Sequence, residues 1–217
     1  MKFVNLGEHN TVLNVFVAQM RDKSVQKDSL RFRRNLERVG EIFAYEISRT
    51  LEYSPKDVHT PLGTATVSTI DDSLVIAAIL RAGLPLHQGL LNYFDSAKSA
   101  FVATYRKYSK GDDFTMNIEY SSSIRPEGKV LIIADAVLAT GASLELVYHR
   151  LLEEGTPSHV HLVCPICSAY AVEHLKKTLP DDVTLWVAAV DEELTSHSYI
   201  VPGLGDAGDL AYGEKSE

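Results

Sequence analysis

The chain of 217 residues has few cysteines and no long apolar run. Its two cysteines, Cys164 and Cys167, form one Cys-x-x-Cys pair without a second pair, which disfavours a zinc site. We expect core packing on a strand, with the two side chains on opposite faces. No run reaches the roughly 18 apolar residues of a membrane span, and the start MKFVNLGEHN lacks a signal peptide's apolar core. These absences predict a cytoplasmic protein that has no membrane partner.

Positive charge is also scarce. Lysine and arginine number 21 against 29 acidic residues, which gives a formal net charge of −8. A general nucleic-acid binder normally presents a basic face, so we expect no nucleic-acid partner. An anionic ligand would then require a local positive field. The hydrophobic fraction of 45% is ample for a core, and we expect one domain over residues 1–217.

The stretch Lys129 to Ser143 combines a predicted strand with a tight turn. Val130 to Ile133 form a continuous apolar run that leads to one acid, Asp135. The small residues Ala139 to Ser143 follow, and apolar residues then keep helical spacing from Leu144 to Leu152. Backbone N–H groups and the positive end of the helix dipole would meet at this turn. The pattern favours a phosphate site, although a loop that binds nothing has the same local pattern.

Two other predicted strands end in arginine. Leu74 to Leu80 is a continuous apolar run followed by Arg81, and the strand Ala100 to Tyr105 is followed by Arg106. Open α/β sheets bind ligands at the carboxyl ends of their strands. Either arginine alone could simply end its strand, but together with Asp135 they predict a site for an anion at this edge.

The remaining pattern predicts the fold class. Ser29 to Leu51 reads as an amphipathic helix, whose Arg31, Arg33 and Arg34 favour a solvated face or a subunit contact over a phosphate site. Strands and helices alternate along the chain, which predicts an α/β fold with a mostly parallel central sheet flanked by helices. The other predicted elements are a turn between Pro55 and Pro61, strands at Ala65–Ile70, His159–Cys167 and Val183–Val190, and a helix at Tyr170–Leu179.

Three segments stand apart from this alternation. We expect a helical N-terminal segment over residues 1–60, a flap or hairpin over 107–128, and a C-terminal hood over 191–217. Residues 109–128 are polar, and a loop of this length is uncommon unless it is functional. The hood has four glycines between Gly203 and Gly213, whose backbone could wrap a small planar ligand. A plain C-terminal coil is the alternative.

Four motifs together resemble the uracil phosphoribosyltransferases, a family of type I phosphoribosyltransferases. They are ILRAGL at Ile79–Leu84, TYR at Thr104–Arg106, ADAVLATGAS at Ala134–Ser143 and YIVPGLGDAGD at Tyr199–Asp209. The resemblance runs from end to end and implies transfer of ribose 5-phosphate from phosphoribosyl pyrophosphate to N1 of uracil, giving UMP and diphosphate. It also implies Mg²⁺ as cofactor and a homodimer or higher homo-oligomer.

The resemblance further implies roles for single residues. Arg81, Arg106 and Asp206 would be catalytic, and Mg²⁺ would be held through the substrate diphosphate, with Asp206 as its protein ligand. Phosphoribosyl pyrophosphate would contact Arg81, Arg106, Asp135, Ala136, Val137, Leu138, Ala139, Thr140, Gly141, Ala142, Ser143 and Asp206. Uracil would contact Tyr199, Ile200, Gly205, Asp206 and Ala207.

The chain departs from the family pattern at several positions. Ala136 stands where proline is usual, Ala142 replaces the second of two glycines, and Leu210 replaces an arginine. The flap between Tyr120 and Arg125 lacks the usual lysine, a loss for which Arg125 or Lys110 could compensate. Two alternatives therefore stay open. One is a weakened paralog that binds phosphoribosyl pyrophosphate or a nucleotide as a sensor or regulator, and the other is a transferase for another base.

Overall fold

A computed structural model describes residues 1–108, 114–122 and 124–215, and of residues 106–108 and 114–116 it describes the backbone alone. Its centre is an eight-stranded sheet with the order β1-β10-β9-β7-β4-β5-β6, in which β8 pairs with β9. Every pairing is parallel except that of β5 with β6. The strands are β1 (Lys2–Asn5), β4 (Leu74–Leu80), β5 (Lys98–Tyr108), β6 (Phe114–Ser121), β7 (Val130–Ala134), β8 (Val137–Leu138), β9 (His159–Ser168) and β10 (Val183–Asp191). The predicted α/β class is confirmed.

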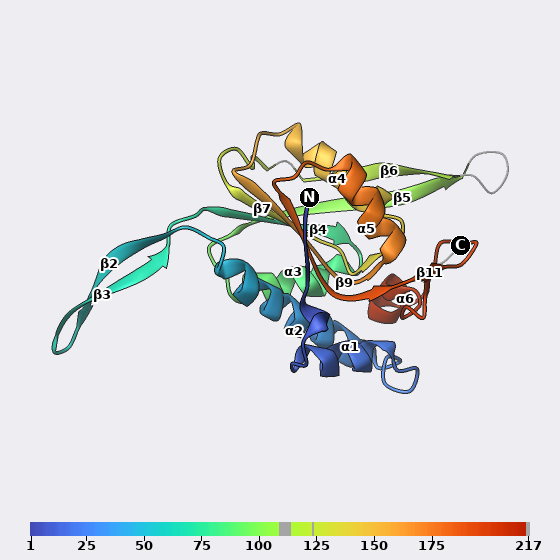
Figure 1. Cartoon of the computed structure of the whole chain (residues 1–217), viewed down its shortest axis with the longest axis horizontal. Helices are drawn as coiled ribbons and strands as arrows, with labels where there is room; N and C mark the ends of the chain where they lie inside the picture. The colour runs from blue at the N-terminus through green and yellow to red at the C-terminus, as the bar shows by residue number, and fades with distance from the viewer. Residues whose placement is uncertain (109–113, 123, 216–217) are drawn as a thin grey trace.

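Helices cover both faces of the sheet (Figure 1). α1 (Leu13–Arg21), α2 (Ser29–Ser48) and α3 (Gly83–Leu91) lie on one face, while α4 (Ala142–Leu152) and α5 (Ala169–Thr178) lie on the other. The central strand β7 serves both apolar layers: Ile132 packs with the first group of helices and Leu131 and Ile133 with the second. A strand buried on both faces requires the continuous apolar run seen in its sequence. Among the described residues, every helix is too short or too polar to span a bilayer.

The N-terminal segment is less helical than predicted. It contains α1 and α2, but β1 adds a parallel strand at the sheet edge and a 3₁₀ turn covers Leu6–Glu8. The predicted turn between Pro55 and Pro61 is wrong, because β2 (Tyr53–Thr60) runs through Pro55 and pairs with β3 (Gly63–Ile70). These two strands form an arm that projects from the body of the molecule (Figure 1). Pro55 is tolerated there because a two-stranded ribbon has an open edge on each strand.

The two cysteines are buried in β9, as predicted, but on the same side of the sheet. Both Cys164 and Cys167 pack in the layer of α4 and α5, whereas Ile166 packs in the opposite layer. The expectation of opposite faces is therefore wrong. The pairing of β9 with β10 skips Pro165, so the strict alternation of faces is interrupted at that residue. Both thiols are free.

The predicted flap and hood both contain secondary structure. β5 extends beyond the predicted strand and forms a long antiparallel hairpin with β6, which projects away from the arm in Figure 1. The predicted hood forms a small two-stranded sheet, β11 (Glu193–Leu194) with β12 (Ile200–Val201), followed by the short helix α6 (Ala207–Tyr212). Figure 1 shows α6 beside the carboxyl edge of the large sheet.

Candidate active site

The turn between β7 and α4 has the geometry of an anion site. Asp135 follows β7, and its backbone N–H donates to the Val163 carbonyl at 3.1 Å. Gly141 then precedes α4 with a φ of +86°, a conformation that favours glycine. The N-cap residue of α4, Gly141, has no side chain to cap the helix, and the Ala142 N–H makes only a long hydrogen bond to Thr140 Oγ1 at 3.4 Å. Unpaired N–H groups at a helix N-terminus attract phosphate.

Residues behind the turn fix its backbone. The buried Ser168 hydroxyl donates to the Ala139 carbonyl at 2.5 Å and accepts the Ala171 N–H at 2.9 Å. Residues Val137 and Leu138 pair with β9 as β8. A Cβ on Gly141 would lie 3.2 Å from atoms of both His174 and Leu175, so α5 also limits the turn from outside. The turn is therefore held by two elements, β9 and α5, that follow it in sequence.

Asp135 is an unusual carboxyl. Desolvation raises its pKa from 3.8 to about 7, against hydrogen bonds from the N–H groups of Ala136 and Val137, which lower it. The carboxyl is buried, although the residue as a whole is half-buried. A carboxyl whose pKa is raised toward neutral pH is typical of a functional site, although structural groups also show such shifts.

Arg81 lies next to this turn, because β4 and β7 are neighbours in the sheet. The approach is close: a Cβ on Gly83 would lie 2.7 Å from the Ala134 carbonyl oxygen. The Leu80–Arg81 peptide bond is cis. Arg81 Nη2 donates to Asp209 Oδ1 at 3.0 Å and to the Gly213 carbonyl at 3.3 Å. The end of β4 is thus joined to the predicted hood.

An ion pair between a half-buried arginine and a buried aspartate holds the start of the hood. Arg21 at the end of α1 contacts both oxygens of Asp191, with Nη1–Oδ2 and Nη2–Oδ1 distances of 2.7 and 2.8 Å. The same two residues bind both backbone groups of Gly203: Arg21 Nη1 donates to its carbonyl at 3.0 Å, and its N–H donates to Asp191 Oδ2 at 3.0 Å. Gln26 Nε2 adds a hydrogen bond to the Leu204 carbonyl at 3.1 Å. The N-terminal segment therefore fixes the backbone that leads into the glycine-rich loop.

The end of the hood is held in a similar way. The Asp206 carboxylate caps α6 by accepting the Asp209 N–H at 3.0 Å. Arg33 Nη1 donates to the Ala211 carbonyl at 2.6 Å, and its guanidinium lies 5.7 Å from the centre of the Tyr212 ring. Arg33 thus makes an intramolecular contact that the sequence analysis did not foresee. Ala207 and Ala211 are buried in the layer of α1, α2 and α3, so α6 belongs to the core on that side.

The predicted uracil contacts differ in exposure. Ile200 and Ala207 are buried, Asp206 is half-buried, and Gly205 and Tyr199 are exposed, the last by 49%. Gly205 has a φ of +94° with open space around its Cα. Because Ala136, Val137 and Ala139 pack in the same apolar layer as Ile200 and Ala207, the turn and the hood share one core.

The positions that depart from the family pattern fit their surroundings. Ala136 is buried, Ala142 begins α4, and Leu210 packs against the apolar layer of α1, α2 and α3. Arg125 lies before β7 and Asp135 lies after it: the Arg125 carbonyl accepts a hydrogen bond from the Lys129 ammonium at 2.8 Å, just before the strand begins. Lys110 and the side chain of Arg106 lie outside the described residues.

Sequence reasoning missed the residues that support the site. Arg21, Gln26, Ser168 and Asp191 contact the turn or the hood, yet each is an ordinary polar residue in its local sequence. Arg21 and Asp191 are 170 residues apart, so no local spacing signals their pairing. Within the described part of the chain, no three His, Cys, Asp or Glu side chains gather into a metal cluster.

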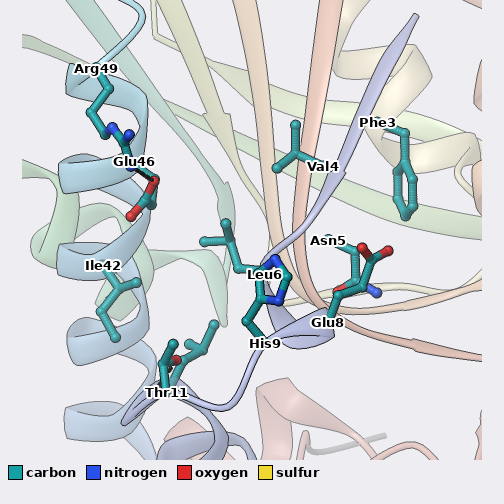
Figure 2. Close-up of a pocket in the computed structure, with 11 residues that line it drawn as sticks. Phe3, Val4, Asn5, Leu6, Glu8, His9, Thr11, Ile42, Glu46 and Arg49 are labelled. Carbon is teal, nitrogen blue, oxygen red and sulfur yellow. Dashed lines mark hydrogen bonds and ion pairs between the residues drawn. The ribbon is translucent and has the colours of Figure 1, made fainter.

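A separate hollow lies between β1 and α2 (Figure 2). Its lining comes from the N-terminal segment and includes Phe3, Leu6, His9 and Ile42, with the ion pair between Arg49 and Glu46 at its rim. None of the residues predicted for the site lines it. This hollow is therefore separate from the predicted site.

Comparisons with known proteins agree with this arrangement. The family model described as uracil phosphoribosyltransferase matches residues 8–214. A uracil phosphoribosyltransferase of Porphyromonas gingivalis is 53% identical over 99% of this chain and 100% of its own length, and one of Pyrococcus furiosus is 34% identical over 95% of this chain and 88% of its own length. A solved structure of an Aquifex aeolicus protein superposes with a TM-score of 0.87 at 28% identity, covering 97% of this chain and 98% of the other. The chain belongs to the uracil phosphoribosyltransferase family.

Proposed function

We propose that this protein is a uracil phosphoribosyltransferase that joins ribose 5-phosphate from phosphoribosyl pyrophosphate to N1 of uracil. In this reaction the bond from C1 of the ribose to diphosphate breaks, the C1–N1 bond forms, and the N1 proton of uracil is released. Family membership over residues 8–214 supports the activity. The observation that carries it is the contact of Arg81 with Asp209, which brings the end of β4 and the hood together beside the turn at Asp135.

The proposed mechanism uses charge and position rather than a covalent nucleophile. Departure of diphosphate leaves positive charge on the sugar ring, as in glycoside hydrolysis. The backbone N–H groups from Ala139 to Ser143, at the start of α4, would hold the 5-phosphate, while Asp135 would accept hydrogen bonds from the ribose hydroxyls. Arg81 and Arg106 would stabilise the diphosphate, because a guanidinium remains charged and offers several donors in one plane. Orientation and electrostatic stabilisation are the two contributions expected from the protein.

The proposal includes Mg²⁺ carried on the substrate diphosphate. Mg²⁺ usually keeps several waters and binds one or two carboxylates together with substrate phosphates. Asp206 fits this role, because its Oδ1 caps α6 and the half-buried side chain has a second oxygen to offer. The cation would neutralise part of the diphosphate charge, and Arg81 would act beside it on the same leaving group.

The hood would read the base. Ile200 would pack against the uracil ring, and Gly205, Asp206 and Ala207 would present backbone groups to its polar edge, with Tyr199 at the rim. The support is the fixed backbone at Gly203 and Leu204, which precedes these residues. A fixed backbone distinguishes the hydrogen-bonding edges of different bases, because a mismatched base leaves buried groups unpaired.

The proposal also includes a homodimer or higher homo-oligomer in the cytoplasm. The arm of β2 and β3 supports self-association, since it exposes Val58, Leu62 and Val67 without packing against the body of the chain. The free thiols of Cys164 and Cys167 suit a reducing compartment. Sedimentation velocity tests the first part, and a monomer at assay concentrations would contradict it.

An assay of UMP formation from uracil, phosphoribosyl pyrophosphate and Mg²⁺ tests the central proposal. Turnover is expected, with hypoxanthine and orotate inactive as acceptors. Saturable binding without turnover would favour the sensor or regulator instead, and turnover with another base would change the substrate. Asp206→Asn tests the proposed role of Asp206. Asparagine also caps helices, so the fold should persist. Turnover should fall more than tenfold, which corresponds to a rise of about 1.4 kcal/mol in the activation barrier.

A further inference from the structure

The guanidinium of Arg81 is held by a carboxylate from the other end of the chain. Arg81 Nη2 donates to Asp209 Oδ1 at 3.0 Å and to the Gly213 carbonyl at 3.3 Å. An arginine side chain has several rotatable bonds, and leaving it free would spread its charge over many positions. These two contacts restrict it to one position at the carboxyl edge of β4.

Asp209 itself is firmly fixed. It lies in the first turn of α6, where its N–H donates to Asp206 Oδ1 at 3.0 Å. Arg33 binds the Ala211 carbonyl, and the buried Ala207 and Ala211 hold the helix against the core. Gly208 leaves room for the arginine, because a Cβ there would lie 3.3 Å from Arg81 Nη2 and 3.2 Å from Asp206 Oδ1. The carboxylate of Asp209 is therefore a rigid acceptor placed beside a flexible cation.

Stability does not explain this ion pair. The side chains of Arg81 and Asp209 are 36% and 33% exposed, and pairs with this much solvent contact contribute little to folding. Meanwhile Arg81 Nε is buried without a hydrogen-bond partner among the described residues. A buried charged donor without an acceptor is unfavourable. A bound ligand could supply the missing acceptor, and anions form the strongest hydrogen bonds with an arginine donor.

We propose that Asp209 is a positioning residue that orients the guanidinium of Arg81 toward the diphosphate of the substrate. This inference rests on the proposed function. Asp209 acts through Arg81 and does not touch the substrate. The opposite assignment would make Asp209 a competitor that occupies the arginine until diphosphate displaces it. The two assignments predict opposite changes in diphosphate affinity when the carboxylate is removed.

The test compares two ligands that touch different parts of the site. Diphosphate would contact Arg81, whereas ribose 5-phosphate would contact the turn at Asp135 to Ser143. Isothermal titration with the full-length protein and Mg²⁺ gives the affinity for each. In Asp209→Asn we expect about tenfold weaker binding of diphosphate and less than a twofold change for ribose 5-phosphate. Kinetics should show a similar rise in KM for phosphoribosyl pyrophosphate, with KM for uracil changed by less than twofold.

Two further variants separate positioning from damage to the hood. Asp209→Glu keeps a carboxylate and should recover part of the diphosphate affinity. Gly208→Ala adds a Cβ against the guanidinium and should weaken diphosphate binding without removing any charge. Glu46→Gln is the control. It removes the partner of Arg49 in a distant exposed ion pair and should leave the affinities for diphosphate and ribose 5-phosphate unchanged.

Each outcome has one interpretation. Unchanged or tighter diphosphate binding in Asp209→Asn overturns the positioning role. An equal loss of diphosphate, ribose 5-phosphate and uracil binding also overturns it, because the effect is then a structural loss of the hood. The wild-type protein tests the proposed function first: if it binds neither diphosphate nor ribose 5-phosphate, the proposed function fails, and the role of Asp209 fails with it.

Discussion

The turn at Asp135 to Ser143 and the hood are two halves of one candidate site, built in different ways. The turn consists of consecutive residues on a strand, loop and helix unit, and each neighbour that fixes it follows soon after in the chain. The hood has only short elements of its own, and α1, α2 and Arg81 hold it from far away in sequence. The turn is therefore supported by elements that lie close to it in sequence, whereas the hood depends on residues from the other end of the chain. Mutations should reveal this difference.

The largest effect is expected for Asp191→Ala, which removes the acid that binds both Arg21 and Gly203. The variant leaves the half-buried Arg21 charge and the buried Gly203 N–H without this partner. We expect the free energy of unfolding to fall by about 3 kcal/mol, the lower end of the range for breaking a buried pair. Urea denaturation measures this loss.

The same variant should affect the two halves of the site unequally. KM for uracil should rise severalfold, because the loop after Gly203 loses its anchor, while affinity for ribose 5-phosphate should change little. Glu153→Ala is the control, since its ion pair with Arg150 is exposed and should leave the unfolding midpoint unchanged. An equal loss of uracil binding and ribose 5-phosphate binding would show that the turn depends on the hood as well.

Gly141→Ala should produce a smaller change in stability and the opposite pattern of binding. The φ of +86° disfavours alanine, and the new Cβ would press on His174 and Leu175. We expect a loss of about 1–2 kcal/mol of unfolding free energy and a severalfold weaker affinity for ribose 5-phosphate, measured by titration. KM for uracil should stay within twofold.

Gly128 offers a matched control for this substitution. It also has a positive φ, +64°, but open space surrounds its Cα and it precedes β7, away from the turn. Gly128→Ala should therefore introduce backbone strain without a new side-chain contact. We expect normal binding of uracil and of ribose 5-phosphate. If Gly128→Ala weakened the binding of ribose 5-phosphate as much as Gly141→Ala does, the turn would not be the binding site for this ligand.

The titration of Asp135 tests the turn in another way, through the dependence of stability on pH. Burial raises its pKa from 3.8 to about 7, so the folded protein holds this proton more tightly than the unfolded chain. The contribution of Asp135 to stability is therefore lost as pH rises from about 4 to 7 and is constant above that range. Urea denaturation at several pH values in this range measures the effect. The free energy of unfolding should fall less with pH for Asp135→Asn than for the wild type. The same dependence on pH in both proteins would contradict the raised pKa.

Sequence patterns predicted the elements whose burial is regular. The apolar runs at Leu74–Leu80 and Val130–Ile133 gave central strands, because both of their faces are covered by helices. β1 was missed, since four residues at a sheet edge are too few to show a period. β2 was missed because both of its faces are exposed, so no apolar alternation marks it as a strand.

The sequence by itself determined the fold class, the turn after β7 and the order of the motifs around it. Periodicity and small residues encode local conformation and burial, and these are properties of neighbouring residues. Only the tertiary structure decided which charges meet. The chain has 21 lysines and arginines and 29 acids, and local spacing does not indicate that Arg21 joins Asp191 or that Arg81 joins Asp209. Those pairings follow from the path of the chain, because a contact between residues this distant forms only once the sheet and its helices are assembled.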